Sequence, residues 1–169
     1  SALIHYLMDI KKGKKISVRR PDSSRLKYVS DWFVQLWSES LGKEFNNKGE
    51  KVNVGLTPIK ALGATDEHSL IQLYNEGPND KLINFIRVKE FDTTLEIPKI
   101  FEYTGIGYLG GKTINELLNS EADSTQVTLL DYSRPTITIN IDKDEELIPN
   151  QLADAFVISN FPSPIYLII

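Results

Sequence analysis

Glu39 and His68 are the two side chains of this chain best suited to moving protons. Glu39 lies in residues 38–43, Ser-Glu-Ser-Leu-Gly-Lys, and His68 lies in residues 63–73, Gly-Ala-Thr-Asp-Glu-His-Ser-Leu-Ile-Gln-Leu. A carboxylate and an imidazole beside glycine-containing turns are the groups needed for acid/base chemistry on a small carbonyl compound. The chain contains only two histidines and no cysteine, so few other side chains can exchange protons near neutral pH.

Apolar spacing and end signals predict the helices that must position these residues: 2–12, 25–41, about 66–76, and one that begins near Thr113. The helix over 25–41 has the clearest pattern and places Glu39 in its last turn. A glycine-proline pair at 77–78 is a strong stop for the third helix. Thr113 and Glu116 fit a capping box at the start of the fourth.

Strands are predicted between these helices over residues 15–18, 82–88 and 136–141, with a weaker one over 52–55. The run over 82–88 is nearly all apolar, which is typical of a buried parallel strand. Thr57-Pro58 is predicted to open a turn or a short helix, and a long irregular connection follows the strand over 82–88. Strands separated by helices predict an α/β fold with a mainly parallel sheet.

Composition narrows the classes of protein and of partner. The 169 residues are 41% hydrophobic and 25% charged, which is typical of one globular domain. A net charge of −4 gives no electrostatic reason to expect a nucleic-acid partner. No stretch approaches the roughly 18 apolar residues of a membrane span, and the first residues lack a secretion signal, so we expect a cytoplasmic protein. The absence of cysteine excludes disulfides and thiolate metal sites.

Residues from about 7 to 90 resemble the C-terminal sugar-isomerase (SIS) domain of the bacterial glucose-6-phosphate isomerase family. The resemblance rests on several blocks that occur in family order and at family-like spacing. These blocks are Asp31-Trp32-Phe33, Leu36-Trp37-Ser38-Glu39-Ser40-Leu41-Gly42-Lys43, Gly55-Leu56-Thr57-Pro58, Gly63-Ala64-Thr65-Asp66-Glu67-His68-Ser69 and Gln72-Leu73-Tyr74-Asn75-Glu76-Gly77-Pro78-Asn79-Asp80-Lys81. The likeness weakens from Phe91 onward, although Arg134-Pro135 before the last strand still fits.

The resemblance implies a three-layer αβα fold, a sugar phosphate substrate and a homodimeric parent enzyme. We expect residues 1–169 to form a single SIS-type domain without the family's N-terminal SIS domain, with residues 151–169 as an atypical tail. The family's phosphate-binding loop and substrate arginine belong to that N-terminal domain. A lysine block near the family's C-terminus also has no counterpart here. We therefore expect little or no turnover from this chain alone.

The resemblance also implies a role for each candidate site residue. Interconversion of an aldose phosphate and a ketose phosphate needs a base that carries one proton between C1 and C2 through a cis-enediol, and the family glutamate matches Glu39. A carboxylate can serve where a partly enclosed site raises its pKa toward neutrality. The family histidine that opens the sugar ring matches His68 and is implied to reach the site of the partner subunit. Gln72, one helical turn later, is a candidate for a polar contact to substrate. No cofactor and no metal are implied.

Several alternatives stand beside this prediction. Without the surrounding match, Glu39 would be interpreted as a solvated surface residue and His68 as a capping or packing residue. His5 matches no family motif and is predicted to be structural. A second hypothesis is a non-catalytic SIS module that binds sugar phosphate. A third is a nucleotide-binding domain, because Gly105–Gly110 formally satisfies G-x-G-x-x-G, although no clean strand precedes it as a dinucleotide site requires.

Overall fold

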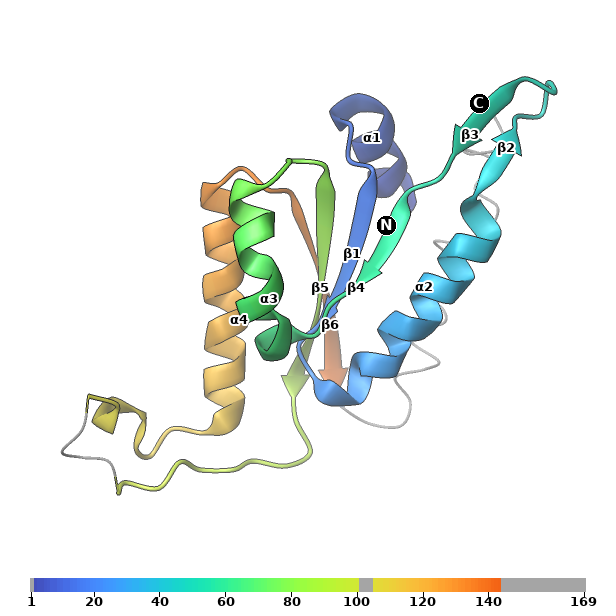
Figure 1. Ribbon diagram of the computed structural model, residues 1–169. Coiled ribbons are helices and arrows are strands. Elements are labelled where there is room, and N and C mark those ends of the chain that lie inside the picture. The colour runs from blue at the N-terminus through green and yellow to red at the C-terminus, as the bar shows by residue number, and fades with distance from the viewer. Residues whose placement is uncertain (1, 101–104, 144–169) are drawn as a thin grey trace.

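The computed structural model describes residues 2–100 and 105–143 (Figure 1). Its elements in chain order are α1 (Ala2–Lys12), β1 (Ile16–Pro21), η1 (Ser24–Leu26), α2 (Lys27–Leu41), β2 (Lys43–Phe45), β3 (Lys51–Val54), β4 (Thr57–Lys60), α3 (Gly63–Glu76), β5 (Lys81–Glu90), η2 (Gly107–Leu109), α4 (Ile114–Asp131) and β6 (Thr136–Lys143). The tail expected over residues 151–169 lies outside the described residues.

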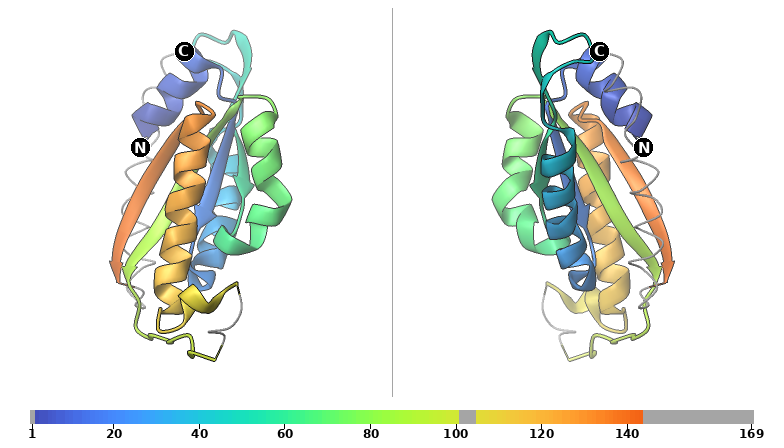
Figure 2. Two further views of the ribbon diagram at one scale, coloured as in Figure 1. Left: turned by 90° about the vertical axis from the view of Figure 1, so that its left-hand side faces the viewer. Right: turned by 90° about the vertical axis from the view of Figure 1, so that its right-hand side faces the viewer.

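Four of the strands form one sheet in the order β4-β1-β5-β6, and every pairing in it is parallel. Helices cover both faces of this sheet, as the two views in Figure 2 show: α3 and α4 lie in front of it in the left view, and α2 lies in front of it in the right view. The predicted α/β class with a mainly parallel sheet is confirmed. In the part of the chain described, no helix is both long and apolar enough to cross a membrane.

The face covered by α2 carries one of two apolar clusters. Phe33 and Trp37 of α2 are buried against Ile86 and Val88 of β5. The indole Nε1 of Trp37 donates a hydrogen bond of 3.1 Å to the carbonyl oxygen of Leu56. The three- and four-residue spacing of the apolar side chains in residues 25–41 is therefore the stripe that binds this helix to the sheet.

The second cluster lies on the opposite face, beneath α3 and α4. Tyr74 of α3 and Leu129 of α4 meet Val18 of β1 and Phe85 of β5. The strand β5 supplies buried side chains to both clusters, so it is buried on both faces, as its nearly continuous apolar sequence predicts.

The prediction for Thr57 and Pro58 was wrong, because these residues belong to β4 rather than to a turn or short helix. Four residues are too few to show a clear period, and proline normally argues against a strand. Here β4 is an edge strand, paired only with β1, so the missing N–H of Pro58 is tolerated. The weaker strand predicted over 52–55 is present as β3, but it pairs with β2 in a separate antiparallel hairpin.

The predicted helix boundaries are close to the observed ones. The helix α3 begins at Gly63, before the predicted start near residue 66, because the Asp66 carboxylate accepts a hydrogen bond of 2.6 Å from the Leu62 N–H. The predicted stop is confirmed, with Gly77 as the C-terminal cap. Thr113 caps α4 in a complete capping box with Glu116, also as predicted.

Candidate active site

Glu39 lies in the last turn of α2, as predicted, and its side chain is exposed. The Gln35 side chain, one turn earlier, donates to Glu39 Oε1 at 3.4 Å. The helix ends at Gly42, and the chain continues into the β2–β3 hairpin, which projects beyond the sheet in Figure 1. A Cβ atom on Gly55, just before β4, would lie 3.3 Å from the carbonyl oxygen of Leu41. The end of α2 that carries Glu39 is therefore close to the amino edge of the parallel sheet.

His68 lies in the second turn of α3 and is also exposed. Its side chain lines an open groove of about 430 Å³ between α3 and α4, together with Ser120, Ser124 and Thr128 of α4. Gln72 is exposed one turn later on α3 and does not line this groove. Neither the His68 nor the Gln72 side chain forms a hydrogen bond to another described residue, so both side chains could bind a ligand that reached them.

The chain does not bring Glu39 and His68 together. The helix α2 lies on one face of the sheet and α3 on the other (Figures 1 and 2). The two helices also approach the sheet from opposite ends of its strands. The end of α2 that carries Glu39 is near the amino ends, whereas α3 begins beside the carboxyl end of β1, where a Cβ atom on Gly63 would lie 2.9 Å from the Cα of Asp22. The structure therefore places Glu39 and His68 of one chain apart rather than in one shared site.

Sequence reasoning missed a buried group of charges at that carboxyl edge. The Arg20 guanidinium donates to the carboxylates of both Asp22 and Glu67. Arg87 of β5 donates to Asp123 of α4, and its Nε lies 3.9 Å from Asp22 Oδ2. The side chains of Arg20 and Asp22 are only 4% and 3% exposed. The signal in the sequence was the pair Arg19-Arg20, which follows the predicted strand over residues 15–18. Basic residues in that position are most simply interpreted as the exposed flank of a strand.

Burial determines the proton affinity of Asp22. It raises the pKa of this carboxyl to about 6, although Arg20 and Arg87 act in the opposite direction. The carboxylates of Glu67 and Asp123 add to the rise. Asp22 Oδ2 has no hydrogen-bond partner among the described residues. The carboxyl is therefore held in an environment that favours its protonated form more than water does.

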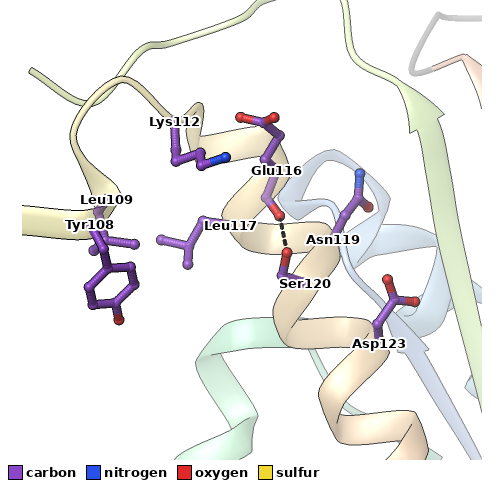
Figure 3. A pocket seen from close by; sticks show the side chains of 8 residues that line it. All are labelled: Tyr108, Leu109, Lys112, Glu116, Leu117, Asn119, Ser120 and Asp123. Atoms are coloured by element: carbon purple, nitrogen blue, oxygen red, sulfur yellow. Dashed lines mark hydrogen bonds between the residues drawn. The ribbon is translucent and has the colours of Figure 1, made fainter. Parts of the chain in front are cut away.

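The glycine-rich segment does not have the setting of a dinucleotide site. Residues Gly107–Leu109 form the short helix η2, and β5 ends at Glu90, far before Gly105 in the sequence. With Lys112 and the first turns of α4, this segment borders a hollow of about 490 Å³ (Figure 3). Among the described residues 91–100, no strand runs directly into the glycine-rich segment, so this segment lacks the strand–turn–helix setting of a dinucleotide site.

His5, the other histidine of the chain, lies in the protein interior. His5 is fully buried, its Nε2 lies 3.1 Å from Ser17 Oγ, and its ring centroid is 5.3 Å from that of Trp37. This setting supports the structural role predicted for it.

In residues 2–100 and 105–143, no three His, Cys, Asp or Glu side chains gather in a way that would hold a metal ion.

Solved structures share this arrangement of helices around a parallel sheet. The match to a hypothetical protein from Thermus thermophilus covers 95% of this chain and 37% of that protein chain. The TM-score is 0.83 and the sequence identity is 30%. The match to a glucose-6-phosphate isomerase from Chlamydia trachomatis covers 98% of this chain and 33% of that protein chain, at a TM-score of 0.80. The second pair is only 14% identical, so that likeness concerns the fold. The chain is thus an α/β domain of a type found within larger proteins.

Curated relatives identify the family. The glucose-6-phosphate isomerase of Carboxydothermus hydrogenoformans is 46% identical over 140 residues, which are 82% of this chain and 30% of that protein. The glucose-6-phosphate isomerase of Rubrobacter xylanophilus is 43% identical over 141 residues, 83% of this chain and 31% of that protein. No protein-family model matches the chain. The chain belongs to the glucose-6-phosphate isomerase family, and it spans about a third of the length of these relatives.

Proposed function

We propose that this chain contributes two catalytic groups to an isomerase that interconverts glucose 6-phosphate and fructose 6-phosphate. The observation that carries the proposal is the high identity to relatives named for this enzyme, which extends over most of the chain. The blocks around Glu39 and His68 supply the carboxylate and the imidazole that the reaction needs.

Glu39 acts as the enediol base. In the open-chain aldose, its carboxylate takes the proton from C2 while the C1 carbonyl oxygen gains a proton, which gives a cis-enediol. The same proton then returns to C1, and the C2 hydroxyl loses its proton to become the ketose carbonyl. Because Glu39 is exposed in this chain, the enclosure that such a base requires must come from protein outside the described residues.

His68 acts in ring opening. It assists transfer of a proton to the ring oxygen as the C1 hydroxyl gives one up, so that the C1–O5 bond breaks and the C1 carbonyl forms. The opposite placement of α2 and α3 supports a homodimer in which His68 serves the site that contains the partner's glutamate. Gln72 lies on the same face of α3 and is proposed as a polar contact to the sugar phosphate.

The test is the substitution Glu39→Gln in the complete protein that contains this sequence, with fructose 6-phosphate formation followed by a coupled assay. We expect turnover to fall by about 100-fold or more, because the amide cannot accept the C2 proton. The matched control is Glu44→Gln, which removes another exposed carboxylate near the end of α2 and should leave the rate unchanged. A near-normal rate for Glu39→Gln would remove Glu39 as the base.

A further inference from the structure

Glu67, the residue before His68, is held from two sides. Its Oε1 pairs with the guanidinium of Arg20 on β1 and accepts a hydrogen bond from the hydroxyl of Thr125 on α4. Three elements, β1, α3 and α4, therefore converge on one carboxylate oxygen. We refer to Arg20, Glu67 and Thr125 together as the Glu67 clamp.

The Arg20 side of this clamp is buried and is held by further contacts. The Arg20 side chain is 4% exposed, and its second guanidinium nitrogen is engaged by Asp22. Its guanidinium carbon also lies 4.8 Å from the ring centroid of Phe85, a fully buried residue of β5. Arg20 therefore has two contacts besides Glu67 that define the position of its guanidinium.

The helix α3 has few other anchors at this turn. Its only buried residues are Gly63 at its start and Tyr74 near its end, while Leu70 and Ile71 are partly buried. The imidazole of His68 forms no hydrogen bond to any described residue, so the position of its ring depends on the placement of α3. At this turn, the Glu67 clamp therefore adds polar contacts with β1 and α4 to the apolar packing of Leu70, Ile71 and Tyr74.

We propose that Glu67 is a positioning residue for His68. The inference rests on the ring-opening role proposed for His68. A proton-transfer group must lie within hydrogen-bond reach of the atoms that it serves, and a displacement of about 1 Å can lower a rate by as much as about 100-fold. The Glu67 clamp holds the imidazole at the place where a sugar phosphate in the partner's site can meet it.

The experiment compares kcat and KM for Glu67→Ala, Glu67→Gln, His68→Asn and the double variant Glu67→Ala/His68→Asn in the complete protein. We expect Glu67→Ala to lower kcat by about 10-fold or more with KM changed little, because the defect is in orientation and not in substrate binding. Glu67→Gln should restore most of kcat, since its amide oxygen still accepts from Arg20 and Thr125. The double variant should match His68→Asn alone, because a positioning residue has nothing left to position.

The outcomes separate this proposal from the one on which it rests. A normal rate for His68→Asn would remove the ring-opening role of His68. If His68→Asn lowers kcat and the double variant lowers it further, by the full effect of Glu67→Ala, only the positioning role of Glu67 is overturned. If Glu67→Ala fails to fold, Thr125→Val replaces it, because this change removes one hydroxyl at nearly constant volume; an unchanged kcat would then count against the proposal. Glu76→Ala at the exposed end of α3 is the matched control and should leave kcat unaltered.

Discussion

Glu39 and His68 are carried by helices that cover opposite faces of one parallel sheet. This relationship makes the proposed two-subunit site testable by complementation. Subunits with Glu39→Gln and subunits with His68→Asn should each be impaired alone. A mixed dimer would contain one site with both native groups, so mixing equal amounts under exchange should recover about a quarter of the wild-type rate.

The recovered rate distinguishes between one-chain and two-chain sites. If both residues served the same site from the same chain, every site in the mixture would lack one group, and activity would stay at the level of the single variants. The measurement is the coupled assay before and after mild denaturation and refolding of the mixture. Wild-type protein treated in the same way gives the reference.

The raised pKa of Asp22 predicts a pH-dependent stability. Its folded-state pKa of about 6 lies above the ordinary value of 3.8, so the folded protein holds this proton more tightly than the unfolded chain does. Its contribution is therefore favourable at low pH and is lost as pH rises from about 4 to about 7, for a total of about 3 kcal/mol. The free energy of unfolding of wild type and of Asp22→Asn, measured with denaturant at several pH values, should show this loss. Wild type should become less stable relative to Asp22→Asn as the pH rises from about 4 to about 7. A difference that stays constant with pH would contradict the expectation, and Asp92→Asn, at an exposed aspartate, controls for net charge.

The two tryptophans offer a matched pair for testing the α2 cluster. Trp37 is 1% exposed and donates to the carbonyl of Leu56, whereas Trp32 is 42% exposed. Trp37→Phe leaves a void and a carbonyl without its donor, so it should lower the free energy of unfolding by about 1–3 kcal/mol. Trp32→Phe should change it by less than about 0.5 kcal/mol. Equal effects in chemical denaturation would show that α2 does not dock through Trp37.

Gly63 is required by a close approach and not by its backbone angles. A Cβ atom there would lie 2.8 Å from Asp22 Oδ1 and 2.9 Å from the Asp22 Cα, a main-chain atom of the residue that follows β1. Alanine normally favours a helix, but a backbone clash outweighs that gain, so Gly63→Ala should destabilise by about 1–3 kcal/mol. Gly105→Ala, with no atom within 4 Å of the added Cβ, is the control. Thermal unfolding that ranks the two variants equally would refute the clash.

Local sequence signals predicted most of the fold. The apolar stripe of residues 25–41, the capping box at Thr113 and the stop at Gly77 each depend on neighbours within a few positions, so each was visible in the sequence. The strand β4 was not visible, because its identity comes from pairing with β1 at the edge of the sheet. Periodicity identifies the buried side of a helix, but it does not say which face of the sheet that helix will cover.

The positions of the candidate site residues in the fold were predictable only in part. The last-turn position of Glu39 followed from helix periodicity, and its proposed role followed from family likeness. The Glu67 clamp was not predictable, because Arg20, Glu67 and Thr125 meet only when β1, α3 and α4 are assembled. Charged residues that are distant in sequence carry no local sign of being buried together.

The strand order has a consequence for synthesis of the protein. Both neighbours of β1 in the sheet, β4 and β5, come after β1 in the chain. Within the described residues, β1 therefore has no strand to pair with until β4 has been made. Parallel pairing between distant segments is also slow, since long loops must close first. The central strand pairing of this sheet is thus completed only after residues 81–90 have been made.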